Sequence, residues 1–242
     1  MENGKRIPST EGTVQGGPIS VLLSNIYLHY VLDLWVEKVV KPRMKGRVYY
    51  VRYLDDFVLA FQGEEDAKRF EQVLPKRLER FFLELQPAKT RLIPFGRWAM
   101  KQAQRTQTRM QTFYFLGFTF YNNRTKTGRY RLGMKTERSR FQRSCAIIKE
   151  ITRTNRHMPL QVQIYRINSF LLGTYHYYGV TGNGALKRLH YYATKQWRKA
   201  LSSRSQSGRL NWEKYLKILS IFPLRRAKIY LPHAKLSEMV LL

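Results

Sequence analysis

Acidic residues and cysteine are scarce in this sequence. Its 242 residues include 16 Asp and Glu against 44 Lys and Arg, which gives a formal net charge of +28. The single cysteine, Cys145, excludes an internal disulfide, and the sequence has no cysteine pair to hold a structural zinc ion. A reducing compartment therefore fits the composition best.

Long apolar runs are also scarce. The opening stretch, MENGKRIPSTEG, lacks the apolar core of a signal peptide. The most apolar run, residues 19–40, is interrupted by Asn25, His29, Asp33, Glu37 and Lys38. We expect this run to be too polar to span a membrane. Because the hydrophobic content of 43% is ordinary for a globular protein, we expect a folded, soluble protein with no membrane partner.

The positive charge is concentrated in the second part of the chain. Residues 1–96 carry a net charge of +3, whereas residues 97–242 carry +25, from 29 Lys and Arg against 4 Asp and Glu. A surface that serves solubility alone would mix both signs. So one-sided a surface attracts polyanions, and we expect nucleic acid as the partner, with an acidic membrane as the alternative.

Apolar spacing predicts an α+β fold with two domains, residues 1–135 and 136–242. The first mixes helices and strands around a predicted hairpin, and the second is helical and basic. The expected helices span about 18–39, 64–85, 136–154, 159–179, 183–202 and 211–219, and the expected strands about 48–53, 57–61, 113–121 and 130–134. Pro75 should kink or split the second helix. The polar stretch 97–112 should be a loop.

Asp55 and Asp56 stand side by side between the two strands of the predicted hairpin. Aspartate is a common turn residue, so an isolated pair would ordinarily be structural. Here the flanking strands are apolar enough to be buried in a sheet, and two adjacent carboxylates repel each other unless a cation neutralises them. Magnesium takes carboxylate oxygens together with substrate phosphates and water, and paired metal ions can serve phosphoryl transfer. A metal site is therefore the alternative to a plain turn.

Several short motifs follow one another between about residues 12 and 200. They are Gln15-Gly16-Gly17-Pro18-Ile19-Ser20, Tyr53-Leu54-Asp55-Asp56, Leu83-x-Leu85-x-Pro87-x-Lys89-Thr90, Phe115-Leu116-Gly117-Phe118, and Ile167–Gly173 with Tyr175-x-Tyr177-Tyr178. Together they resemble group II intron-encoded reverse transcriptases and maturases, and the last is similar to the maturase domain X that forms the thumb. The resemblance implies an RNA-directed DNA polymerase with a partial palm followed by an α-helical, thumb-like domain.

The resemblance also implies roles for individual residues. Asp55 and Asp56 would be catalytic acids that bind Mg²⁺, or alternatively Mn²⁺. Nucleotide binding would involve Gln15, Gly16, Gly17, Tyr53 and Lys89. Glycine permits close approach of a nucleotide to the backbone, although Gly16-Gly17 can equally be a helix-entry turn and Lys89 a solvated lysine. The substrates would be an intron RNA template, a DNA primer and deoxynucleoside triphosphates.

The start of the sequence departs from the family pattern. The family polymerase uses a third acid from an earlier hydrophobic-Asp-hydrophobic motif, which follows a fingers region, and about a dozen residues precede Gln15. Asp33, the other Asp before the hairpin, lies in a predicted helix. We therefore expect a fragment that lacks the fingers and the first catalytic Asp, for which a separately encoded N-terminal half is a candidate partner. Leu54 and Val21 stand where family members usually have Ala and Pro.

Basic and aromatic residues are interleaved in residues 136–242, a pattern that favours contact with RNA through phosphates and stacked bases. The candidate nucleic-acid-binding residues are Arg138, Arg140, Arg143, Lys187, Arg188, Lys195, Arg198 and Lys199, with Arg225, Arg226 and Lys228 as a further patch. Most individual aromatics are better explained as the core of a helical bundle; these include Tyr177, Tyr191, Trp197 and Trp212.

Three functional hypotheses follow from these observations. The first is RNA-templated DNA synthesis by two-metal nucleotidyl transfer. The second is a non-catalytic, RNA-binding maturase that assists intron splicing, and the third is an inactive remnant of an intron reading frame. The resemblance implies a cytoplasmic, nucleic-acid-associated protein of a prokaryote, and an organelle is the alternative location.

Overall fold

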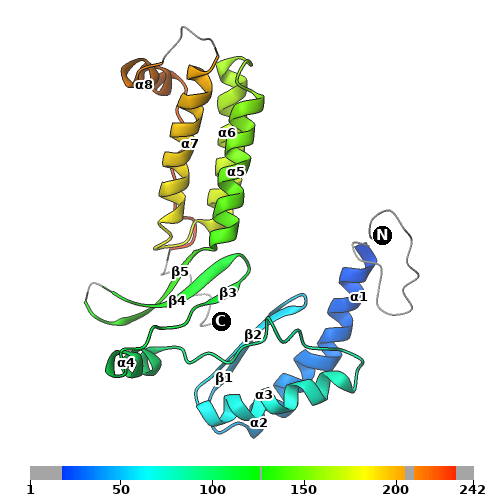
Figure 1. Ribbon diagram of the computed structural model, residues 1–242. Helices are drawn as coiled ribbons and strands as arrows, with labels where there is room; N and C mark the ends of the chain where they lie inside the picture. The colour runs from blue at the N-terminus through cyan, green and yellow to red at the C-terminus, as the bar shows by residue number, and fades with distance from the viewer. Residues whose placement is uncertain (1–17, 126, 205–209, 233–242) are drawn as a thin grey trace. The chain divides into compact units, whose positions relative to one another are not determined.

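The computed structural model describes residues 18–125, 127–204 and 210–232 (Figure 1). The chain packs as two compact units, residues 1–94 and residues 95–242. Each unit has its own hydrophobic core. Helices combine with two small antiparallel sheets, an arrangement compatible with the predicted α+β class.

The first unit is a long helical stretch followed by a hairpin and another helix. Its elements are α1 (Pro18–Leu28), the π-helical segments η1 (His29–Asp33) and η2 (Val36–Val40), α2 (Lys41–Arg43), β1 (Val48–Tyr53), β2 (Asp56–Phe61) and α3 (Glu64–Glu79). The predicted first helix and hairpin are thereby confirmed. The helical stretch continues to Arg43, four residues beyond the prediction, because Pro42 is accommodated in the first turn of α2 rather than ending the helix.

One face of the hairpin packs on the helices. The core of this unit is formed by Val31, Leu32, Val36, Val40, Phe70, Leu74 and Leu78, with Tyr50, Phe57, Leu59 and Phe61 of the hairpin against it. Side chains alternate across a strand, so the other face points outward. Tyr49, Val51 and Tyr53 are each more than half exposed. The expectation that these strands are buried in a sheet is therefore wrong for this face.

Helix α3 runs through Pro75 without being split and ends at Glu79, six residues earlier than predicted. The chain turns there because Phe82 adopts a left-handed conformation, with φ of 55°. The amide of Phe82 donates to the carbonyl of Glu79 at 3.0 Å and that of Leu83 to the carbonyl of Leu78 at 3.1 Å. Such bonds satisfy the last carbonyls of a helix, so the end of α3 is a built turn rather than fraying.

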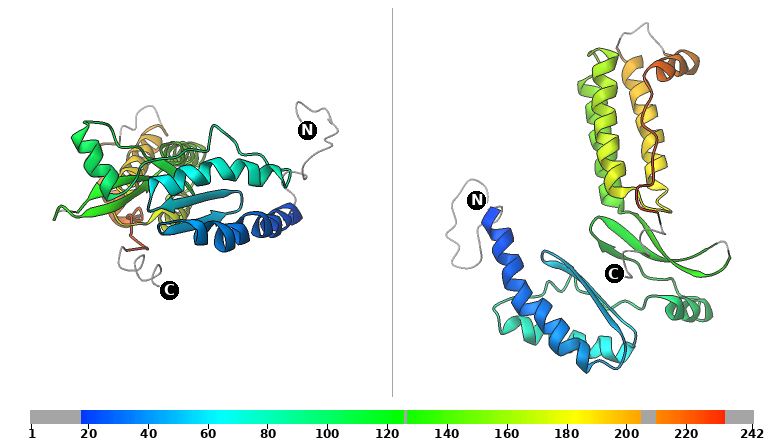
Figure 2. Two further views of the ribbon diagram at one scale, coloured as in Figure 1. Left: turned by 90° about the horizontal axis from the view of Figure 1, so that it is seen from below. Right: turned by 180° about the vertical axis from the view of Figure 1, so that it is seen from behind.

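The second unit places a three-stranded sheet at one end of a helical bundle (Figures 1 and 2). Its elements are α4 (Arg97–Arg105), β3 (Phe113–Phe115), β4 (Phe118–Arg124), β5 (Tyr130–Thr136), α5 (Arg138–Thr154), α6 (Leu160–Tyr178), α7 (Ala185–Ser202) and α8 (Trp212–Ile221). The antiparallel strands lie in the order β3-β4-β5. Helices α5 to α8 confirm the four helices expected after residue 136.

The core of the second unit lies between α5, α6 and α7. Its fully buried members include Ile148, Ile167, Leu171, Tyr175, Leu189, Trp197 and Tyr215. The indole N–H of Trp197 donates to Gln163 Oε1 at 2.9 Å, and the Tyr215 hydroxyl donates to the carbonyl of Thr194 at 2.8 Å. These bonds satisfy the polar ends of Trp197 and Tyr215, which would otherwise destabilise the core.

Two predictions between residues 97 and 121 are wrong. The stretch expected to be a loop begins with the helix α4, and the expected single strand at 113–121 is a tight hairpin of β3 and β4. Leu116 and Gly117 form its turn, with φ of 49° and 73°. Two consecutive left-handed residues reverse the chain in the manner of two-residue hairpin turns. Residues 113–121 are almost all aromatic or apolar, so the sequence predicted one strand and not a turn within it.

The packing units divide the chain differently from the predicted domains. The three-stranded sheet falls with the helical bundle, so the division by packing lies at Pro94 and not at residue 135. The physical reason is that Phe118 of β4 packs on Tyr177 and Tyr178 of α6. The assignment of residues 1–135 and 136–242 to a palm and a thumb remains a prediction.

The first helical stretch is long and apolar enough, by length and composition alone, to cross a membrane over Ile19–Arg43. By hydropathy, the expectation that the run of residues 19–40 is too polar to span a membrane is therefore wrong. Part of its apolar character has a different explanation, because Val31, Leu32, Val36 and Val40 lie in the core of the first unit. The same test is passed by core helices of soluble proteins.

Candidate functional site

The sequence Tyr53-Leu54-Asp55-Asp56 forms the tip of the β1–β2 hairpin. Tyr53 pairs with Asp56, so the turn consists of Leu54 and Asp55 alone, one residue fewer than the sequence suggested. Leu54 has φ of 57°, a left-handed conformation that costs a residue with a Cβ atom roughly 1–2 kcal/mol. The surroundings of the turn must offset that cost.

Arg52 holds the turn from behind. Its Nη1 donates to the carbonyl oxygen of Leu54 at 2.8 Å and to Asn25 Oδ1 at 2.9 Å. Its Nε and Nη2 donate to the two carboxylate oxygens of Asp33, at 2.7 Å and 2.6 Å. The Tyr50 hydroxyl donates to the same carboxylate at 2.7 Å. The hairpin tip is therefore tied to α1 and η1 by one planar guanidinium, which donates four hydrogen bonds.

This network changes the acidity of its members. The hydrogen bond from Arg52 is the main cause that lowers the pKa of Asp33 below its ordinary value, against the opposing effect of burial. The bond to Asp33 likewise raises the pKa of Arg52. Burial, followed by the bond to Asp33, raises the pKa of Tyr50. Asp33 is therefore an ionised anchor for Arg52. Sequence analysis missed Arg52, whose only signal was a charged residue among apolar strand positions.

Asp56 lies on the outward face of the hairpin. Residues directly opposite each other in an antiparallel pair project to the same side, and Asp56 stands opposite the exposed Tyr53. Arg52, which pairs with Phe57, lies on the opposite, packed face. Asp33 is bound on that packed face and so does not join Asp55 and Asp56. The sequence placed Asp33 in a predicted helix and not in a strand, and in the structure it lies in η1, apart from the acid pair.

The exposed pair Asp55 and Asp56 suits a hard cation. The two carboxylates make no hydrogen bond or ion pair with the described residues. Two carboxylates match the usual protein contribution to a magnesium site, in which substrate phosphates and water supply the other oxygens. Within residues 18–125, 127–204 and 210–232, no group of three His, Cys, Asp or Glu residues is placed to hold a metal ion. The pair therefore fits as part of a metal-binding set.

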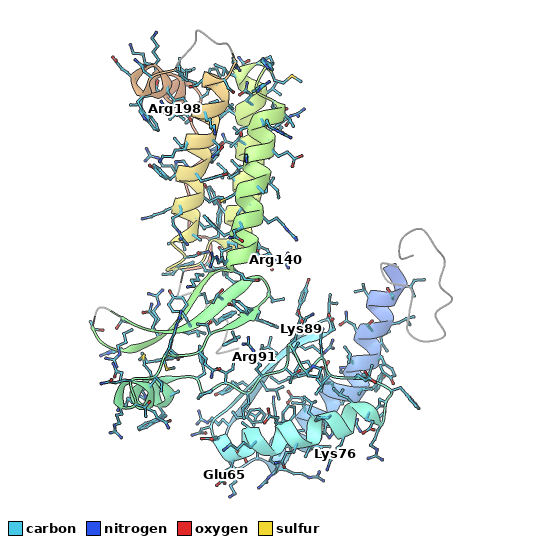
Figure 3. All side chains as sticks on the ribbon, in the orientation of Figure 1. Glu65, Lys76, Lys89, Arg91, Arg140 and Arg198 are labelled. Atoms are coloured by element: carbon cyan, nitrogen blue, oxygen red, sulfur yellow. The ribbon has the colours of Figure 1, made fainter. Side chains whose placement is uncertain are left out.

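The remaining nucleotide-binding candidates are less constrained. Tyr53 shares the outward face with Asp56 and is 57% exposed. Lys89, labelled in Figure 3, is exposed and follows a turn in which its amide donates to the carbonyl of Gln86 at 3.0 Å. It belongs to the same compact unit as the hairpin. Gln15, Gly16 and Gly17 lie outside the described residues.

Two of the motifs contact each other in the second unit. The hydroxyl of Tyr177 donates to the carbonyl of Leu116 at 3.1 Å, and the Tyr178 ring lies edge-on to Phe118, with centroids 5.1 Å apart. A Cβ atom at Gly117 would lie 2.8 Å from the Tyr178 hydroxyl oxygen. Glycine is required at this turn on two grounds, its positive φ and its contact with Tyr178.

The basic candidates on the helical bundle are spread along its length. Figure 3 shows Arg140 at the end of α5 next to the sheet and Arg198 at the far end of α7. Those with exposed side chains are Arg138, Arg140, Arg143, Lys187, Arg188, Lys195 and Lys199. Arg198 is half-buried, donates to the carbonyl of Leu210 at 3.0 Å and stacks on Trp212 at 4.4 Å. Arg198 is thus engaged in the fold, whereas the others are exposed, although Arg188 also lies over the Phe141 ring, 5.1 Å from its centroid.

Of the four aromatic side chains predicted to lie in the core of the helical bundle, one is buried and three are exposed. Trp197 is fully buried, as a core residue should be. Tyr177, Tyr191 and Trp212 are 56%, 58% and 43% exposed, so placing them in the core was wrong. Tyr191 lies beneath the ammonium group of Lys195, 4.7 Å from the ring centroid. This exposed pairing of cation and ring is the composition found where proteins bind single-stranded nucleic acids.

Comparison with known families gives a match over the first part of the chain. Residues 1–120 match the family model described as "Reverse transcriptase (RNA-dependent DNA polymerase)". The matched region contains the whole first unit and the β1–β2 tip with its two acids. A search of curated proteins found no match. The family match supports a reverse transcriptase-type domain, a class that uses nucleic acid templates, deoxynucleoside triphosphates and divalent metal ions.

Proposed function

We propose that the protein takes part in RNA-directed DNA synthesis as the palm and thumb of a group II intron-type reverse transcriptase. Asp55 and Asp56 would bind Mg²⁺ or Mn²⁺ and so position the reacting phosphate, while the basic helical unit binds the template and primer. The observation that carries this proposal is the exposed acid pair on a hairpin tip braced by Arg52, inside the region that matches the family. The two acids have no hydrogen-bond or ion-pair partner among the described residues.

The chemistry requires little of the protein beyond placement and charge. In phosphoryl transfer the attacking and leaving oxygens carry the developing negative charge, which bound divalent cations neutralise. The chain would contribute carboxylates held in one geometry by the Arg52 network. Tyr53, on the same face as Asp56, would line the site beside them. The metal ions, when bound, supply the electrostatic stabilisation of the transferred phosphate.

Substitution of the acids tests the proposal. Asp55→Asn and Asp56→Asn keep the side-chain shape and remove the charge, so each should weaken Mn²⁺ binding. In a reaction that also contains a polypeptide with the fingers and the third acid, each should reduce primer extension on an RNA template by at least about 100-fold. Glu71→Gln, at an exposed acid of α3, is the matched control and should change neither. Electron paramagnetic resonance of Mn²⁺ reads binding directly. Equal Mn²⁺ affinity in the wild type and both Asn variants would refute the metal role.

A second function has its own support. Residues 95–242 hold 29 Lys and Arg against 4 Asp and Glu, a charge that suits RNA binding without chemistry. A maturase role in intron splicing would need this unit and not the acids. A splicing assay with the Asp55→Asn variant separates the two functions, because undiminished splicing with lost primer extension assigns both to the protein.

A further inference from the structure

Helix α4 exposes a tryptophan among basic side chains. Trp98 is 72% exposed. The Lys101 ammonium group lies 5.0 Å and the Arg97 guanidinium 5.7 Å from the centroid of its ring. With 3.6 residues per turn, Trp98, Lys101 and Arg105 fall on one face of the helix. The exposed face of α4 therefore combines an aromatic ring with three positive charges.

The opposite face of α4 anchors the helix. Ala99, Met100 and Ala103 are half-buried there. The helix is also fixed at both ends to β4, since the amide of Gly96 donates to Asn122 Oδ1 at 2.9 Å and Arg124 donates to Gln104 Oε1 at 2.7 Å. Trp98 is thus presented by a helix whose position is set by tertiary contacts, and its exposure is not the result of a loose loop.

The charge around α4 is of one sign. Residues 95–136 contain nine Lys and Arg and no Asp or Glu. In the part of this stretch that the structure describes, Arg97, Lys101 and Arg105 have exposed side chains. The exposed Trp98 ring is apolar surface that a partner can cover, and the surrounding positive charge favours an anionic partner.

We propose that the exposed face of α4, formed by Trp98, Lys101 and Arg105, binds single-stranded nucleic acid. The indole stacks on an unpaired base, and the two cations contact the phosphates beside it. Stacking is available only from a strand whose bases are unpaired, which selects single strands over duplex. The proposal uses neither of the acids of the proposed function and would stand if Asp55 and Asp56 bound no metal.

An anionic membrane is the competing partner for a basic face with a tryptophan. Interfacial helices insert a continuous apolar face into the bilayer. In α4 the small apolar residues point away from Trp98 and are half-buried, so one aromatic ring is all that this face could insert. Nucleic acid is therefore favoured, and the experiment includes vesicles as a separate arm.

The test uses the full chain with fluorescein-labelled single-stranded RNA, the same sequence as single-stranded DNA, and the RNA duplex. Trp98→Ala should weaken binding of the single strands by about 5- to 150-fold, the range for loss of one stacked base, and leave duplex binding within about twofold. Trp98→Phe should recover most of the affinity. Tyr165→Ala, which truncates a ring of 73% exposure on α6, is the matched control and should have no effect.

A second variant covers the case in which Trp98→Ala perturbs folding. Lys101→Gln with Arg105→Gln removes two phosphate contacts and should lower the salt dependence of single-strand binding by about 1.4 in the slope of log affinity against log salt. Binding by Trp98→Ala that equals that of the Tyr165→Ala control would overturn the proposal. So would an equal loss of duplex binding, or Trp98-dependent binding to phosphatidylserine vesicles with no Trp98 effect on RNA or DNA.

Discussion

Asp33 should stabilise the first unit chiefly by holding Arg52 in place. In the folded protein Asp33 accepts two bonds from Arg52 and one from Tyr50, and the two charged side chains are only 22% and 11% exposed. Removing one partner of a fully buried ion pair costs about 3–5 kcal/mol, whereas removing one from an exposed pair costs at most about 1 kcal/mol. Asp33 lies nearer the buried case, so Asp33→Ala should lower the free energy of unfolding by about 2–4 kcal/mol.

Urea denaturation measures that loss, and hydrogen exchange locates it. The amides of β1 and β2 should lose protection in Asp33→Ala, because Arg52 would no longer tie the Leu54 turn to η1. Glu64→Ala is the control, since the Glu64–Lys68 pair is exposed and its loss should change the free energy of unfolding little. If Asp33→Ala and Glu64→Ala were equally stable and the hairpin amides kept their protection, the bracing role of Arg52 would be refuted.

Two further predictions concern pH and glycine. The pKa of Asp33 is lowered in the folded state from an ordinary value of 3.8. The stabilisation by ionised Asp33 is therefore complete above pH 3.8 and is lost as the pH falls through the lower folded-state pKa. When unfolding is measured against pH, the free energy of unfolding should fall more steeply below pH 3.8 in the wild type than in Asp33→Asn. Gly179→Ala should cost about 1–3 kcal/mol, because its Cβ atom would collide with the carbonyl of Tyr175 and lie 2.9 Å from that of Lys228. Gly173 lies within α6, where an added Cβ atom would meet open space, so Gly173→Ala should instead stabilise the protein by about 0.5–1 kcal/mol. Thermal or urea unfolding checks this pair, because the two substitutions should change the free energy of unfolding in opposite directions.

Helices and strands with regularly spaced apolar residues were predictable, because this spacing can be read directly from the sequence. Helices α5 to α8 and the β1–β2 hairpin all follow regular apolar spacing, which local reasoning can detect. The short helix α4 has a narrow apolar face made of small residues and depends on bonds to Asn122 and Arg124, about twenty residues further along. No local pattern reports such contacts, and the polar composition of residues 97–112 therefore suggested a loop.

The candidate site shows the same limit. The acid pair and its turn could be found from sequence because adjacent carboxylates between two apolar strands are distinctive. The brace could not be found, because Arg52 meets Asp33 and Asn25 only after the hairpin has docked on the helices. The exposure of Tyr49, Val51 and Tyr53 was missed for a related reason. An apolar strand predicts burial, but it does not say whether the described part of the chain supplies a partner for both faces.

The Arg52 network also bears on why two carboxylates can stay unpaired in a protein of net charge +28. An exposed acid in so basic a chain would ordinarily attract a lysine or arginine. The cation nearest to the turn along the chain, Arg52, is already neutralised by Asp33, with two bonds in the geometry that a guanidinium prefers. Asp33 thereby holds Arg52 on the packed face of the hairpin, away from the outward face that carries Asp56. In the proposed function this favours metal binding, because pairing with arginine would neutralise a carboxylate and leave fewer of its lone pairs for a divalent cation. Asp33→Ala should therefore weaken Mn²⁺ binding at the tip even under conditions in which the variant remains folded, through an arginine released to compete for the acids.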